Sequence, residues 1–122
     1  MNLTEFRVSR TAAILALAYP LTFLALYFTL LFHLRLGLGR WPIHISDNPR
    51  TPLFHAHEVA AGFLFAFGAI FVPISGAFAI ALAGAPRARR VATWLAIFTG
   101  GGLVAYAAMH LAPKSFMMWW WD

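Results

Sequence analysis

Five histidines and one glutamate are the residues of this chain whose types could do chemistry. They are His33, His44, His55, His57, His110 and Glu58. Neutral imidazole binds zinc, copper and haem iron, and a carboxylate can complete such a site or carry a proton. The chain has no cysteine, which excludes disulfides, thiolate metal sites and iron–sulfur clusters held by cysteine. Any metal, haem or quinone chemistry would therefore rest on the histidines.

The spacing of two of these histidines limits how they could hold a metal. His55 and His57 are two residues apart, so on a helix their side chains point about 200° away from each other. They could chelate one ion only if the segment is still extended, as residues beside Pro52 can be. With Glu58 as the third ligand, His55 and His57 are the predicted metal site. The alternative is that each imidazole simply lies where the bilayer meets water.

A haem b group would need one histidine from each of two helices. His33 at the end of one apolar run could pair with His110 or His57 at the ends of the others, so these three are the predicted cofactor-binding residues. Glu58 is costly in an apolar helix unless it is paired. Its candidate partners are His33, His110, Arg35 and Arg50. An interfacial glutamate that reaches water or pairs with arginine is the alternative to a proton or quinone role.

The run from His55 to Glu58, followed by Gly62 and Phe63 at the start of a predicted helix, resembles a stretch in the NnrS family. That family comprises haem- and copper-containing membrane proteins linked to nitric oxide metabolism. The resemblance implies haem or copper as the group that these histidines would hold. Members of the family are much longer and have more membrane spans, and the resemblance covers this run alone.

Three apolar runs must position these side chains. Thr11–Phe32, Val59–Gly84 and Val91–Ala112 contain no Asp, Glu, Lys or Arg, and each exceeds the roughly 20 residues that a spanning helix needs. The sequence predicts an all-α membrane protein, a single transmembrane domain over 1–122. Its three helices, at about 11–34, 54–84 and 91–112, would form an up-down-up bundle. All five histidines and Glu58 would then lie on one membrane face.

The charge pattern indicates a membrane partner rather than a nucleic acid. Only 11% of the residues are charged, against about 25% in an average soluble domain. The net charge of +5 comes from residues that flank the apolar runs, where they meet lipid head groups. Arg87, Arg89 and Arg90 crowd into a short turn, which favours a cytoplasmic N-terminus by the positive-inside rule. We expect a multi-pass protein of a bacterial inner membrane.

Small and aromatic residues suggest contacts between helices. Small side chains recur every four residues in the third run and predict an internal packing seam or a contact with another protein. These residues are Ala92, Ala96, Gly100, Val104 and Ala108. The tail Phe116–Trp121 predicts an aromatic anchor in the membrane interface, as a short helix, or a partner contact.

No sequence motif of a catalytic site is present: the chain has no P-loop, GxSxG, HExxH or Gly-rich dinucleotide loop. We therefore expect no catalytic residues. The predicted function is that of a non-catalytic accessory or assembly subunit of a larger respiratory or photosynthetic membrane complex, in contact with lipid and other subunits. The alternative is a membrane redox protein that binds haem b, copper or a quinone through the histidines.

Overall fold

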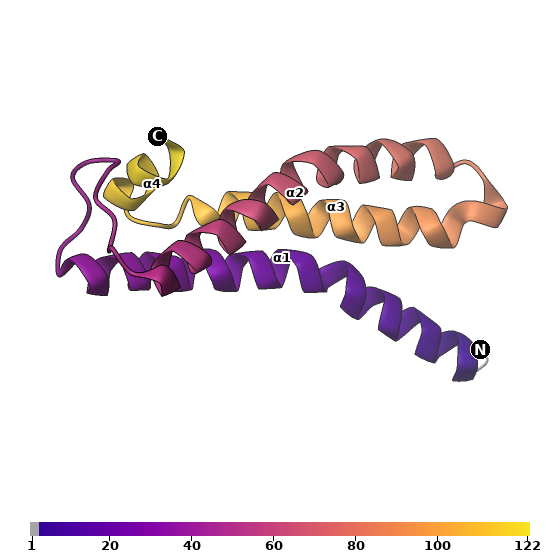
Figure 1. Cartoon of the computed structure of the whole chain (residues 1–122). Helices are drawn as coiled ribbons and strands as arrows, with labels where there is room; N and C mark the ends of the chain where they lie inside the picture. The colour runs from indigo at the N-terminus through magenta and orange to yellow at the C-terminus, as the bar shows by residue number, and fades with distance from the viewer. Residues whose placement is uncertain (1–2) are drawn as a thin grey trace.

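The computed structural model describes residues 3–122, and in that range the chain contains helices and no strand. Three long helices are followed by one short helix (Figure 1). Their bounds are α1 Leu3–Leu38, α2 Pro52–Leu82, α3 Arg89–Met109 and α4 Lys114–Trp121, with a 3-10 turn, η1, at Pro86–Ala88. The predicted all-α fold is confirmed.

Each of the three long helices is long and apolar enough to cross a membrane. The spans are Arg10–Leu38, Pro52–Leu82 and Pro86–Met109. The start of α1 and the α2–α3 turn lie at one end of the bundle, whereas the 39–51 loop, α4 and the C-terminus lie at the other (Figure 1). The up-down-up order is therefore confirmed, and the chain is a small multi-pass membrane protein.

Local signals explain where α1 ends and α2 begins. α1 continues past the predicted limit of residue 34 until Gly39, which has a φ of +70° and so leaves the helical region. Thr51 caps α2, because its side-chain oxygen accepts the N–H of Phe54 at 3.2 Å. Pro52 takes the first helical position, where a missing N–H is harmless.

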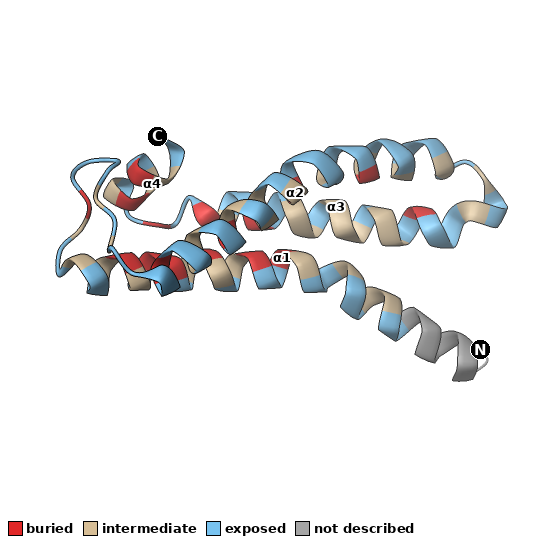
Figure 2. Ribbon diagram, in the orientation of Figure 1, coloured by how far each residue is buried: buried red, intermediate tan, exposed pale blue. Residues whose placement is uncertain are grey.

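The buried core lies at the end of the bundle that carries α4 (Figure 2). Its largest side chains with less than 2% exposure come from all four helices: Tyr27, Phe54, Phe116, Leu30, Leu34 and Met109. The aromatic tail forms a short helix, α4, as the sequence predicted. However, α4 folds back on its own bundle and buries Phe116 and Trp119. The tail is thus part of the core of this chain.

The internal seam of α3 differs from the predicted ridge. Of the predicted small residues, Ala92 is buried, whereas Ala96, Gly100 and Val104 are exposed. The surface that meets α1 and α2 is formed instead by Gly101, Gly102, Ala105 and Met109, which follow on a neighbouring face of the helix. A Cβ on Gly101 would lie 3.1 Å from Cγ of Pro20, and one on Gly102 would collide with Val72. Close backbone approach therefore requires glycine on this second face.

Candidate functional site

Two helices bring two histidines into direct contact. His33 lies near the end of α1 and His57 near the start of α2, and their Nδ1 atoms are 3.1 Å apart. The two ring centroids are 5.4 Å apart. Phe54 meets the His33 ring edge to face at 5.2 Å, and both imidazoles are partly buried. Of the three predicted cofactor-binding histidines, these are the two that the fold places together.

The surrounding acceptors decide where the protons of this pair lie. Nε2 of His57 is 3.0 Å from the carbonyl oxygen of Leu26 and 3.1 Å from Oγ1 of Thr29. Because a carbonyl oxygen can only accept, Nε2 of His57 carries the proton. In the neutral ring, Nδ1 of His57 is then an acceptor, so Nδ1 of His33 must be the donor. Nε2 of His33 is left with a lone pair.

The side chains of the predicted metal ligands His55, His57 and Glu58 do not converge on one point. His55 and His57 both lie on the helical part of α2, so the extended segment needed for their joint chelation is not formed. His57 turns to α1, whereas Nδ1 of the exposed His55 lies 3.7 Å from Oε2 of Glu58. Glu58 is thus paired within α2 rather than with the predicted partners on other elements. Among residues 3–122, no three His, Asp or Glu side chains are grouped to hold a metal ion.

The other two histidines make separate contacts. His110 caps the end of α3, where its exposed ring lies 2.9 Å from the carbonyl oxygen of Tyr106 and packs edge to face on the Tyr106 ring. Both of these contacts are within one turn of α3, so the fold does not join His110 to the His33–His57 pair. His44 is exposed in the loop, and its backbone N–H donates to Oδ2 of Asp47.

The geometry of the pair fits a small ion better than haem iron. Zinc or copper lies about 2.0–2.1 Å from an imidazole nitrogen, so nitrogens 3.1 Å apart could share an ion at an angle of about 100°. Both Nδ1 atoms would have to be deprotonated, and further ligands would have to come from water or another molecule. A haem iron between two histidines needs their nitrogens about 4 Å apart, twice the bond length. The haem prediction would therefore require the two helices to separate.

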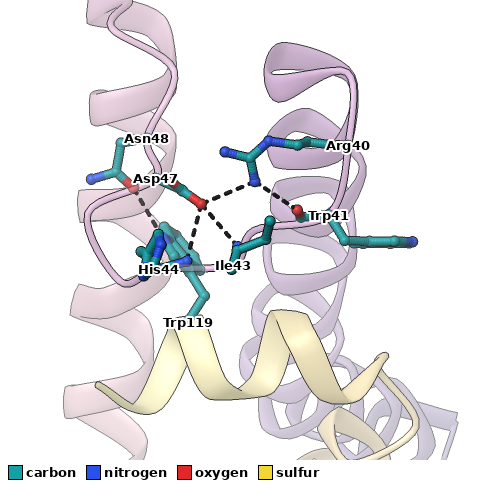
Figure 3. Close-up of polar contacts among 7 residues, drawn as sticks. All are labelled: Arg40, Trp41, Ile43, His44, Asp47, Asn48 and Trp119. Atoms are coloured by element: carbon teal, nitrogen blue, oxygen red, sulfur yellow. Dashed lines mark hydrogen bonds and ion pairs between the residues drawn. The ribbon is translucent and has the colours of Figure 1, made fainter.

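The 39–51 loop is held by an ion pair and by hydrogen bonds that meet at Asp47. Asp47 Oδ2 accepts from the Arg40 guanidinium at 3.0 Å and from the backbone N–H groups of Ile43 and His44 at 2.8 and 3.0 Å (Figure 3). The Arg40 hydrogen bond, followed by these N–H donors, holds the pKa of Asp47 far below its usual range. The ion pair joins Arg40 at the start of the loop to Asp47 near its end.

Two hollows that the sequence did not reveal lie along the bundle. One of about 210 Å³ is lined by apolar side chains of all three long helices, including Phe23, Val72 and Met109. Another of about 290 Å³ lies between the start of α2 and the end of α4 and is lined by Glu58, Gly62, Phe65, Trp119, Trp120 and Trp121. The second hollow, hereafter the tryptophan hollow, places a carboxylate among aromatic rings.

Comparison of the chain with protein-family models, with curated proteins and with solved structures finds no match. The resemblance of the run from His55 to Glu58 to the NnrS family therefore stays confined to that run.

Proposed function

We propose that this membrane protein is a non-catalytic accessory or assembly subunit of a larger membrane complex, of the respiratory or photosynthetic kind. The observation that supports this most is the exposed face of α3 formed by Ala96, Gly100 and Val104. In lipid, helices associate through close packing at small residues, and a small residue every fourth position permits that approach. No atom lies within 4 Å of a Cβ built on Gly100. We therefore assign this face to a transmembrane helix of another subunit.

The distribution of buried residues supports the same role. Most residues of α2 are exposed and the N-terminal half of α3 buries only Ala92, whereas burial is concentrated near α4 (Figure 2). The N-terminal part of α1 diverges from α2 and α3 (Figure 1). One end of the bundle is thus held together by its own core, and the other leaves apolar helix surface for lipid and for neighbouring subunits.

The proposed setting is a bacterial inner membrane with the N-terminus in the cytoplasm. Arg87 and Arg89 lie at the α2–α3 turn, at the same end as the start of α1, and both are exposed. Arginines in a short connection are retained on the cytoplasmic side. The 39–51 loop and α4 would then face the periplasm.

Recovery of the intact complex tests this proposal. The tagged full chain is purified from its native membranes in mild detergent, and the bound subunits are identified and quantified by mass spectrometry. The expected result is stoichiometric recovery of the subunits of one known membrane complex. Recovery of the chain alone, at unchanged helix content, would overturn the proposal.

A matched pair of substitutions locates the contact. Gly100→Ile adds a branched side chain on the exposed face of α3, and we expect it to remove the partner subunits while the chain itself stays folded. Ala77→Ile makes the same kind of change at an exposed position of α2 and should leave recovery unchanged. Equal recovery with both variants would contradict the assignment of the partner to the α3 face.

A redox or metal-binding membrane protein is the second candidate, and the His33–His57 contact favours it. Two imidazoles joined at 3.1 Å between two helices could hold copper with outside ligands, or accept a hydrogen bond at Nε2 of His33 from the hydroxyl of a quinone in its reduced, quinol form. His110 for haem, and His55 with Glu58 for a metal, are the other residues proposed for this role. A reduced-minus-oxidised optical spectrum and metal analysis of the purified chain separate the candidates. A haem band or stoichiometric copper that is lost in His57→Phe would favour this second role, whereas a colourless, metal-free chain would remove the haem and metal versions of it.

A further inference from the structure

The tryptophan hollow combines two features that recognise organic cations. Its lining consists of three tryptophans and a phenylalanine, together with one carboxylate, that of Glu58. Aromatic ring faces attract cations, tryptophan most strongly, and groups of such rings bind quaternary ammonium ligands. A carboxylate adds direct charge attraction. Neither feature favours an anion.

The aromatic rings that line the hollow also pack on one another. The planes of Trp120 and Trp121 are inclined at 89° and 82° to the plane of Phe65, with centroids 5.9 and 5.3 Å from its centroid. Trp119 is held in place, because its Nε1–H donates to Oδ1 of Asn48 at 3.0 Å. Side chains fixed in this way bind a ligand with little further loss of conformational entropy.

Gly62 and Glu58 leave space and negative charge on the α2 side of the hollow. Nothing lies within 4 Å of a Cβ built on Gly62, so the space beside this glycine is free. The side chain of Glu58 retains 34% exposure, and in the described range its ion-pair partner is the exposed His55, which is charged only when protonated. With a neutral His55, the Glu58 carboxylate has no cationic partner within this cluster.

We propose that the tryptophan hollow binds an ammonium head group, as choline or ethanolamine presents it. The residues that line the hollow belong to the first turns of α2 and to α4. These segments lie at the end of the bundle that carries the 39–51 loop (Figure 1). This is the level at which tryptophans meet lipid head groups. A phospholipid head group is thus the nearest source of the ligand, and a free amine is the other source with the same chemistry.

Native mass spectrometry of the purified full chain tests the proposal. The chain is exposed to phosphatidylcholine, phosphatidylethanolamine and phosphatidylglycerol with identical acyl chains. We expect one lipid of an ammonium type to be retained about tenfold more than phosphatidylglycerol, which has no amine. Equal retention of the three lipids would overturn the lipid source.

Substitutions that remove charge or space provide the controls. Glu58→Gln and Gly62→Leu should each reduce the retained lipid about tenfold, the first by loss of the carboxylate and the second by filling the hollow. Asp122→Asn removes one negative charge at the C-terminus and should have no effect. Because a Cβ on Gly62 meets no neighbouring atom within 4 Å, Gly62→Leu keeps the test decisive if Glu58→Gln fails to fold.

Titration of the unaltered chain with tetramethylammonium chloride distinguishes a free amine from a phospholipid head group as the source of the ligand. A saturable change in tryptophan fluorescence, absent with sodium chloride and lost in Trp121→Leu but kept in Trp94→Leu, would support an ammonium site even if the lipids are retained equally. Equal lipid retention together with no response to tetramethylammonium would overturn the proposal. The lipid and tetramethylammonium tests use the purified chain alone, so their results are independent of whether partner subunits are recovered.

Discussion

Trp119 and Asn48 are 71 residues apart, yet the indole Nε1–H of Trp119 donates a 3.0 Å hydrogen bond to Oδ1 of Asn48 (Figure 3). This bond joins α4 to the loop between α1 and α2. The loop side is itself fixed, because Asp47 binds Arg40 and two backbone N–H groups. One end of the bundle is therefore closed by a polar link from the loop to the aromatic tail.

Removal of the acceptor at position 48 should loosen α4. Asn48→Leu leaves the indole N–H of Trp119, a residue with 7% exposure, without its partner. A buried donor left unpaired costs about 1–3 kcal/mol. We expect faster hydrogen exchange in α4 and a lower melting temperature in detergent. Ser46→Ala, an exposed change in the same loop, should alter neither; equal exchange in both variants would contradict the role of this bond.

Acid should loosen the same loop through Asp47. Hydrogen bonding to Arg40, then to the backbone N–H groups of His44 and Ile43, lowers the pKa of Asp47 from its ordinary 3.8. A pKa that is lower in the folded state means that the carboxylate stabilises the loop above pH 3.8, and that this contribution is lost as the pH falls from there towards the depressed value. Between pH 5 and 8, which lie above both values, it should stay constant.

Hydrogen exchange of the 39–51 loop as a function of pH measures this effect. After correction for intrinsic exchange rates, protection should fall only below about pH 3.8 in the unaltered chain. In Asp47→Asn, the loop should be less protected at neutral pH and should lack the acid-dependent step. An acid step of equal size in Asp47→Asn would assign it to another carboxyl group.

The seam between α1 and α2 should not tolerate a methyl group at Gly68. A Cβ there would collide with the hydroxyl of Tyr19, which donates to the carbonyl oxygen of Leu64 at 2.7 Å. Gly68→Ala must displace that ring, and overpacking of this kind costs about 1–3 kcal/mol. Gly100→Ala, where the new atom meets open space, should leave the stability of the isolated chain unchanged or slightly raised. Unfolding by a denaturing detergent compares the two, and equal stability would show that Tyr19 adjusts freely.

Tyr27 should contribute a measurable bond between α1 and the last turn of α3. Its side chain is fully buried, and its hydroxyl donates to the carbonyl oxygen of Met109 at 3.2 Å. Tyr27→Phe keeps the ring contacts and removes only this bond, so we expect a loss of about 0.5–1.5 kcal/mol. Tyr106→Phe, at a half-exposed ring, is the matched control. A larger loss with Tyr106→Phe would contradict the assigned role of the Tyr27 hydroxyl.

The two paired histidines should have different neutral tautomers. Contacts with Leu26 and Thr29 assign the proton of His57 to Nε2, which in turn assigns that of His33 to Nδ1. Nitrogen NMR of selectively labelled histidine, at a pH where both rings are neutral, reads each tautomer directly. Thr29→Val should leave the assignment intact, because Leu26 still accepts. An Nδ1–H tautomer at His57 would contradict the observed contact.

The sequence by itself determined the membrane-spanning helices, their order and the end of the bundle that holds the histidines. Uncharged apolar runs of this length have one stable form in a bilayer, since only a helix satisfies its backbone within each segment. Thr51, Pro52 and Gly39 set helix ends by local rules. The opposite directions of His55 and His57 also follow from helical periodicity alone.

The tertiary structure alone decided which residues meet. Helix periodicity cannot show that Gly102, and not Gly100, lies in the seam, because both positions are glycine. Which face of α3 lies inside depends on how the helix is rotated against Val72 and Pro20. In the same way, the contact of His57 with His33 instead of His110 depends on how α1 and α2 cross. The return of α4 onto the core, which forms the tryptophan hollow, depends on long-range packing that no local pattern encodes.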